Sequence, residues 1–308
     1  MPEDVLVENG FVGTALPGCL FQSPAFFRLH AVQHGVFFEW VQDGRVLACI
    51  HFTPGEAGLW RSPARGTFAG YAWVDELRPE DLFAFHDAVM ARLLALGARR
   101  VEILPAPMAH DPDRFSQQLY LLRSRGFDIT QCDLNQSLEV DGRALAERMS
   151  YGNVKRLRKC EREGLVTSAL PLSDLPEVHA TLSANRASKG HAMSMSLAAL
   201  QDMASALPDA LQLFGCRAMG EMAAAAVCVR LSAEVMYVFC WGDRPGYGSL
   251  SPVVPVAQAI YAHCQATGVR QLDVGTSTVD REPNFGLLQF KRGLGFGSSL
   301  KLRLARDL

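Results

Sequence analysis

AVMARLLALGARRVEIL, at residues 88–104, is matched in the second half of the chain by AIYAHCQATGVRQLDV, at residues 259–274. In each copy a segment with helical spacing of apolar residues ends at a glycine, Gly97 or Gly268, and a short apolar strand follows. Two more pairs keep the same order along the chain: Gly70-Tyr71 with Gly246-Tyr247, and LLRSRGFDI at 121–129 with FKRGLGFGS at 290–298. The offsets between paired residues are 176, 171 and 169, so they drift in one direction only.

This order favours an internal duplication over the alternative that any two helix–glycine–strand units look alike. We therefore predict an α+β fold, a mixed sheet with helices on both faces, made of two tandem modules over residues 1–140 and 141–308. The first module is expected to hold a hairpin at 36–53 that turns at Asp43-Gly44, and helices at 79–96 and 112–125. The second is expected to hold five helices, at 141–163, 173–188, 195–206, 252–267 and 284–294. An interruption of the first of these at Gly152-Asn153 is the alternative.

The composition is that of a globular protein: 308 residues, 49% hydrophobic and 20% charged. These values exclude a disordered or fibrous chain. No apolar run approaches the roughly 18 residues of a membrane helix, and the acidic start MPEDVLVENG lacks the order of a signal peptide. We therefore expect a cytoplasmic protein. The eight cysteines form no C-x-x-C pair, so neither a disulfide framework nor a metal site is expected.

The net charge of −2 hides an asymmetry between the two halves. Residues 1–140 carry a net charge of −6, whereas residues 141–308 carry +4. All five lysines lie in the second half. An anionic ligand is therefore expected to bind the second module, which is also the module expected to carry the active site.

The loop Asp243-Arg-Pro-Gly-Tyr-Gly248 lies between an expected strand and the helix that begins near Pro252. A glycine-rich turn at the start of a helix lets backbone N–H groups and the helix dipole face an anion. We expect this loop to bind a phosphate-bearing cofactor through Arg244, Gly246, Tyr247 and Gly248. The alternative is an ordinary turn, and Asp243 is an unhelpful neighbour for phosphates.

The segment KRLRKCER, at 155–162, has five basic residues and one acidic residue. On a helix its bases gather opposite an apolar stripe. We predict that Lys155, Arg156 and Lys159 bind an anionic substrate; a solvated outer face remains the alternative.

A third segment places Lys291 beside Leu287 and Leu288 on one helix. A lysine among apolar neighbours is partly desolvated, so its charge can act strongly on a phosphate or a developing oxyanion. The alternative is a lysine that extends along the helix to reach water.

Three segments together resemble the FemAB-like acyltransferases of the GNAT superfamily: NVKRLRKCEREG at 153–164, LDVGTSTVDREPN at 272–284 and GLLQFKRGLGF at 286–296. Residues 20–140 resemble the first module of that family more loosely. The resemblance implies two tandem GNAT-like domains and transfer of an acyl or aminoacyl group to an amine. It also implies a role in envelope or polysaccharide metabolism.

Carried over by position, the resemblance points to Arg156 and Lys159, to Asp273, and to Lys291 as catalytic or binding residues. This sequence departs from the family at Asp243 and at Gly293, which lies inside the last expected helix. It also lacks the long heptad arm of some bridge-forming ligases, which favours acyl-CoA over aminoacyl-tRNA as donor. No permanently bound cofactor is implied.

Acyl transfer needs a group that polarises the carbonyl, a held amine and a cradle for the donor's phosphates. We expect Lys291 and strand 236–241 to polarise the carbonyl, and strands 236–241 and 270–274 to separate around the donor. Asp273 and Asp280 are the candidate general bases. The acceptor is expected to be a small molecule or a precursor with phosphate, and no DNA partner is expected. The competing hypothesis is a degenerate module that only binds an anionic, nucleotide-linked or envelope precursor.

Overall fold

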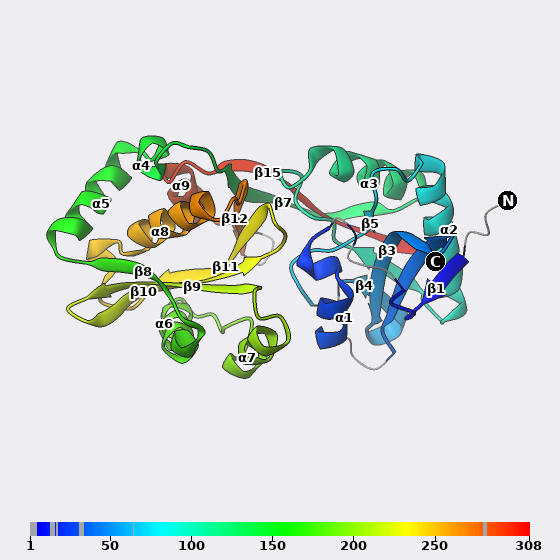
Figure 1. The fold of residues 1–308 in the computed structure, drawn as a ribbon, viewed down its shortest axis with the longest axis horizontal. Coiled ribbons are helices and arrows are strands. Elements are labelled where there is room, and N and C mark those ends of the chain that lie inside the picture. The colour runs from blue at the N-terminus through cyan, green and yellow to red at the C-terminus, as the bar shows by residue number, and fades with distance from the viewer. Residues whose placement is uncertain (1–4, 13–15, 17, 31–33, 64, 280–281) are drawn as a thin grey trace. The chain divides into compact units, whose positions relative to one another are not determined.

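The computed structural model describes residues 5–279 and 282–308, apart from 13–15, 17, 31–33 and 64. The chain divides into two compact units (Figure 1). The first unit comprises Met1–Asp133 with Leu300–Leu308, and the second comprises Leu134–Ser299.

The first unit is built on a mixed sheet with the strand order β1-β2-β3-β4-β6-β15. These strands are Val5–Glu8, Val36–Gln42, Arg45–Pro54, Leu59–Ser62, Arg100–Ile103 and Gly297–Asp307, and the short β5 (Ala72–Trp73) pairs with β3. The β2–β3 hairpin turns at Asp43 and Gly44, which both have positive φ, +51° and +75°. Such a turn matches the twist of the strands that it joins, so the predicted hairpin is confirmed.

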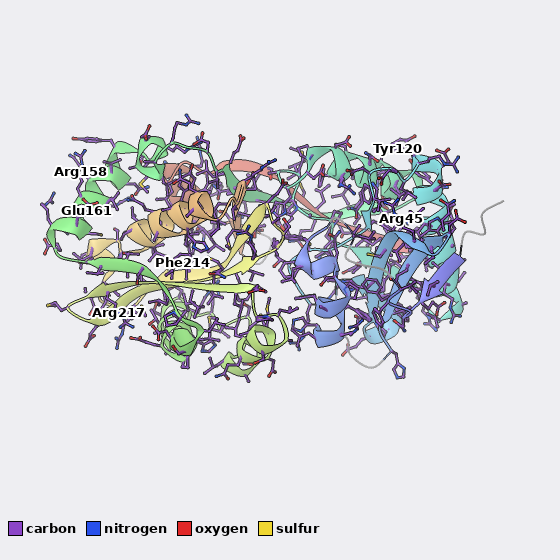
Figure 2. All side chains as sticks on the ribbon, in the orientation of Figure 1. Arg45, Tyr120, Arg158, Glu161, Phe214 and Arg217 are labelled. Atoms are coloured by element: carbon purple, nitrogen blue, oxygen red, sulfur yellow. The ribbon has the colours of Figure 1, made fainter. Side chains whose placement is uncertain are left out.

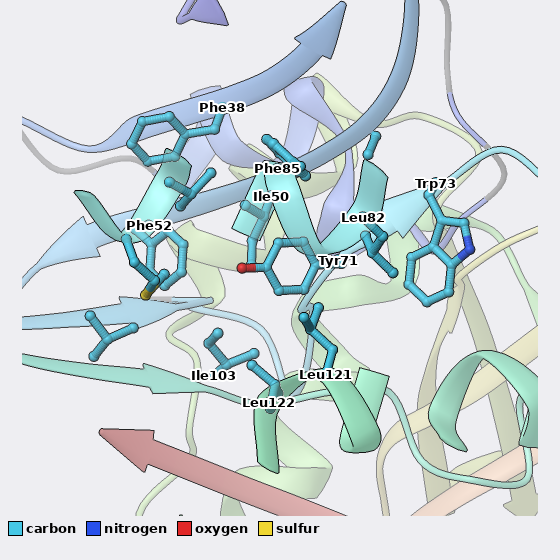
Figure 3. Close-up of a cluster of buried hydrophobic side chains, with 14 of the residues drawn as sticks. Phe38, Ile50, Phe52, Tyr71, Trp73, Leu82, Phe85, Ile103, Leu121 and Leu122 are labelled. Carbon is cyan, nitrogen blue, oxygen red and sulfur yellow. The ribbon is translucent and has the colours of Figure 1, made fainter. Parts of the chain in front are cut away.

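Among the residues that the structure describes, three α-helices complete the first unit: α1 (Pro24–His30), α2 (Pro79–Ala95) and α3 (Pro112–Ser124). Leu82 and Phe85 of α2 and Leu121 and Leu122 of α3 pack with strand residues such as Phe38 in one apolar core (Figure 3). A smaller cluster forms on the other face of the β2–β3 hairpin, from Phe27, Phe37, Cys49 and Ala72. Burial on both faces explains why β2 and β3 are apolar almost throughout rather than alternating.

The second unit repeats this plan, with the strand order β8-β9-β10-β11-β12-β7. Its strands are Val166–Leu170, Leu211–Ala218, Glu221–Arg230, Val235–Asp243, Gln271–Thr276 and the end of β7 (Asp128–Glu139). Its α-helices are α4 (Leu145–Arg148), α5 (Tyr151–Arg162), α6 (Leu175–Ala187), α7 (Leu197–Ala206), α8 (Val253–Ala266) and α9 (Phe285–Gly293). Within the described residues, none of the helices combines the length and the apolar character that crossing a membrane requires.

In each sheet neighbouring strands among the first four are antiparallel, the fifth (β6 or β12) is parallel to the fourth, and the sixth (β15 or β7) is antiparallel to the fifth. Individual hydrogen bonds are repeated as well. Arg99 N–H donates to Gly58 O (2.9 Å) in the first unit, and Arg270 N–H donates to Glu234 O (2.8 Å) in the second. The two copies therefore share one topology, and the predicted duplication is confirmed at this level.

The sixth strand of each sheet comes from the other half of the sequence. Residues 135–139 of β7 pair with β12 in the second unit, and residues 304–307 of β15 pair with β6 in the first. The boundary at residue 140 stays a prediction about where the sequence repeat divides. The compact units do not follow that boundary, because the sheet of each unit takes its sixth strand from the other half of the sequence.

One predicted element is wrong: the single helix at 141–163 is two helices, α4 and α5, with a break at Ser150. Ser150 caps α5 by accepting a hydrogen bond from Asn153 N–H, and its own N–H donates to Gly293 O (2.8 Å). A Cβ on Gly293 would lie 2.9 Å from the Asn153 amide nitrogen. The break and the glycine inside the last helix therefore have one cause, the close packing of α5 on α9.

Candidate functional site

Strands β11 and β12 pair over three residues only and then part. Val235, Met236 and Tyr237 face Gln271, Leu272 and Asp273, and the pairing ends there although both strands continue. Beyond Tyr237, β11 pairs with β10 and with no other strand in the part of the chain that the structure describes. The expected separation of these two strands is therefore found. Beyond Tyr237 it leaves one edge of β11 without a neighbouring strand among the described residues.

A β-bulge lies in β11 just beyond this point. Val227 faces Cys240 and the next residue, Cys228, faces Val238, so Phe239 is an extra residue in the ladder. The extra residue of a bulge is left outside the regular hydrogen-bond pattern, and bulges of this kind re-aim backbone groups near active sites.

Lys291 is buried at the end of β12. Its side chain comes from α9 and is 2% exposed. Its ammonium donates to two backbone carbonyls, Gly275 O at 3.0 Å and Thr276 O at 2.7 Å. The alternative of a lysine that reaches out to water is therefore wrong, and the charge has a fixed place beside the separated strands.

Asp273 is fully buried and shapes the same segment. Its carboxylate accepts hydrogen bonds from the Asn135 side chain (3.0 Å) and from Gly275 N–H (2.6 Å). Gly275 has a φ of +72°, and between Asp273 and Thr276 the pairing of β12 with β7 is irregular. A carboxylate with no exposed area is poorly placed to take a proton from a substrate, so the general-base role predicted for Asp273 does not suit this geometry. The other candidate, Asp280, lies outside the described residues.

The loop after β11 holds the predicted cofactor-binding residues. Asp243 is bonded to α6: the Asn185 side chain donates to its backbone oxygen (2.6 Å) and to its carboxylate (3.0 Å). Arg244 lies 3.4 Å from the Glu221 carboxylate, and Tyr247 OH donates to the same oxygen at 3.3 Å. Gly246 adopts a φ of +98° in the turn.

Several backbone N–H groups in this loop and in the turn that follows it lack hydrogen-bond acceptors among the described residues. These are the N–H groups of Gly246, Gly248 and Ser249. A 3-10 turn at Gly248–Leu250 leads into α8, whose first residue is Val253. These amides precede Val253, the first residue of the 14-residue helix α8, by four to seven residues. Backbone N–H groups without acceptors in a turn before a helix can hold an anion.

The basic helix α5 packs against this turn. Lys159 donates to Ser249 O (3.0 Å), and the Cys160 thiol donates to Leu250 O (3.0 Å). Burial raises the pKa of Cys160 to about 11, so the thiol stays protonated. The structure thus brings Lys159 to the predicted loop.

The other basic side chains of α5 face outward. Lys155 and Arg156 are exposed; the Lys155 ammonium lies 4.5 Å from the centre of the Tyr151 ring, and Arg156 donates to Asn153 Oδ1 at 2.7 Å. Arg158 and Glu161 lie on the exposed side of the same helix (Figure 2).

Sequence reasoning missed the polar residues of β7 beside this site. Asn135, Gln136 and Ser137 are 1%, 0% and 7% exposed. The available signal was the run of three polar residues between Leu134 and Leu138, because buried polar groups in a strand need partners.

Comparisons with known proteins agree with this geometry. Residues 151–292 match the family model described as an acetyltransferase (GNAT) domain. No curated protein matches the chain. The fold is similar to the crystal structure of FemX, with a TM-score of 0.74 and 14% identity over 97% of this chain and 94% of that one.

Two further structures share the fold. A tandem GNAT protein from the clavulanic acid biosynthesis pathway has a TM-score of 0.56 and 13% identity over 99% of this chain and 98% of that chain. L-PGS from Bacillus licheniformis has a TM-score of 0.58 and 11% identity over 84% and 81%. The fold is therefore that of two tandem GNAT-like modules.

Proposed function

We propose that this chain is an acyltransferase that transfers the acyl group of an acyl-CoA to an amine, since residues 151–292 match the model of an acetyltransferase (GNAT) domain and the fold is similar to that of FemX. The acceptor that we propose is a phosphate-bearing precursor of envelope or polysaccharide metabolism. The observation that carries the proposal is the end of β11–β12 pairing at Tyr237 and Asp273. The amides of a pantetheine arm can add to the free edge of β11 as a strand would.

The donor's phosphates would meet the loop at 243–248. The amides of Gly246 and Gly248 and the start of α8 supply donors and a favourable dipole. Arg244 and Tyr247 stand at the same place and share Glu221 as partner. In the proposed complex these two side chains turn from Glu221 to the phosphates.

In the reaction the amine attacks the thioester carbonyl, a C–N bond forms and the C–S bond breaks. The negative charge that builds on the carbonyl oxygen is stabilised by fixed donors nearby. Lys291 is proposed as the cation, and the bulge at Phe239 as the source of a backbone N–H. The amine loses one proton, and the CoA thiolate finally takes one up.

The acceptor's phosphate is proposed to bind the exposed basic face of α5, through Lys155 and Arg156, with Lys159 towards the donor loop. These side chains can follow a flexible precursor, because they project from one helix at spacings of one to four residues.

The test begins with donor binding. Calorimetric titration with acetyl-CoA should show binding that Arg244→Ala weakens. Arg217→Ala is the matched control, because Arg217 also belongs to the second unit and is also paired with a glutamate, Glu177. A panel of amines with and without phosphate is then screened for release of the CoA thiol. An absence of both binding and thiol release with short- and long-chain acyl-CoA would overturn the proposal.

A further inference from the structure

Ser277 follows the two residues whose carbonyls bind the Lys291 ammonium, and it connects this segment to β7 and to the start of α9. Its N–H donates to Leu134 O of β7 (3.2 Å), and its carbonyl accepts from Asn284, the residue that caps α9 (2.8 Å). Its hydroxyl donates to the side chain of Gln136 (2.5 Å). Ser277 follows Thr276, whose carbonyl holds the Lys291 ammonium.

Gln136 also contacts α9, the helix that carries Lys291. The side-chain amide of this residue donates to Leu288 O (3.3 Å), and Leu288 precedes Lys291 by one turn of α9. One fully buried amide thus binds both the segment whose carbonyls hold the ammonium and the helix that carries it.

We propose that Gln136 is a positioning residue for Lys291, which acts by fixing α9 against the segment at 275–277. The proposal rests on the catalytic role proposed above for Lys291. In the proposed reaction Gln136 touches no reacting atom. Its side-chain amide keeps the distances from the Lys291 ammonium to the carbonyls of Gly275 and Thr276 constant during turnover.

The physical reason is the cost of a buried polar group. An amide with no exposed area must keep its hydrogen bonds, because losing one leaves a desolvated donor or acceptor. Gln136 therefore resists any movement that would separate Ser277 from Leu288. An apolar side chain of the same length would fill the space without resisting that movement.

The kinetic test is a double-mutant cycle on the full-length protein. Gln136→Met keeps the volume and removes both hydrogen bonds; it is compared with Lys291→Met and with the double variant. Gln118→Met is the control, because Gln118 is also a buried glutamine, 4% exposed, and lies in the first unit. We expect Gln136→Met to lower kcat by about tenfold with little change in KM, and to add almost nothing once Lys291 is replaced.

A second measurement does not depend on activity. The protein has only five lysines, so brief labelling with acetic anhydride followed by mass spectrometry reports each of them separately. Lys291 is expected to react slowly in the native protein. In Gln136→Met its labelling should rise about tenfold relative to the exposed Lys155, and in Gln118→Met it should not.

The outcomes separate the two proposals. If Lys291→Met is fully active, the catalytic role of the lysine fails, whereas the labelling result still decides whether Gln136 holds it. If Lys291→Met is impaired but Gln136→Met lowers kcat to the same extent with or without the lysine, the positioning role is wrong. Unchanged labelling of Lys291 in Gln136→Met contradicts it as well.

Discussion

Leu122 and Lys291 occupy the same position in the two copies of the fold. The carbonyl of Leu122 accepts Phe127 N–H (3.0 Å), and the carbonyl of Lys291 accepts Phe296 N–H (3.2 Å). Both helices end at glycines of positive φ, Gly126 and Gly295. One copy therefore has an aliphatic side chain where the other has an ammonium, and chemistry that depends on this cation is confined to the second unit.

Replacing Lys291 by Met should lower turnover by about two to three orders of magnitude, the loss typical of a missing oxyanion donor. The melting temperature should fall as well, because the carbonyls of Gly275 and Thr276 lose a donor, so turnover is compared at a temperature where both proteins are folded. Steady-state kinetics with acetyl-CoA check this, with Lys189→Met as the control. A rise in KM at unchanged kcat would show instead that Lys291 binds phosphate.

Asp273→Asn should destabilise the protein by about 1–3 kcal/mol, because an amide nitrogen would then face one of two donors, Asn135 Nδ2 or Gly275 N–H. Urea unfolding measures this. Activity should fall with the acidic limb of its pH profile unchanged. A stable, inactive variant that has lost that limb would restore Asp273 as the general base.

Gly295→Ala should cost more stability than Gly268→Ala, although both glycines have positive φ, +98° and +70°. The strain of the left-handed backbone costs each variant about 1–2 kcal/mol. A Cβ on Gly295 would also lie 2.8 Å from Arg148 Cβ, whereas a Cβ on Gly268 meets nothing within 4 Å. Equal midpoints in urea would contradict the close approach of Gly295 to Arg148.

Stability should fall as the pH drops from about 6.5 towards 4, because of two histidines of the first unit. Burial lowers the pKa of His86, which bonds to Tyr71 OH, and of His51, which bonds to Phe21 O, to about 4 each. In this window the unfolded chain binds more protons than the folded one, so each histidine contributes a slope of up to about 1.4 kcal/mol per pH unit.

Urea unfolding at pH 7 and pH 5 measures that slope, and the variants His86→Gln and His51→Gln should each reduce it. His179→Gln is the control, because His179 lies in the second unit and is only partly buried. An equal slope in all four proteins would refute the assignment.

The sequence predicted what local residues determine. The helix ends at Gly97 and Gly268 were visible because each glycine takes a positive φ after the last turn. An interruption at Gly152-Asn153 was visible as an alternative, but the break at Ser150 was not, because its backbone partner, Gly293, is distant in sequence. The same holds for the site: Lys291 was identified from its neighbours in α9, but its carbonyl partners and Gln136 come from other elements.

The exchange of β7 and β15 also constrains how the protein can be made on the ribosome. After residue 133 has emerged, the first sheet still lacks its sixth strand, which arrives only with residues 300–307. The second unit has all of its strands once residue 299 is synthesised. The unit that begins the chain is therefore the last to be completed, and until then the edge of β6 that β15 will cover stays open to other strands or to a chaperone.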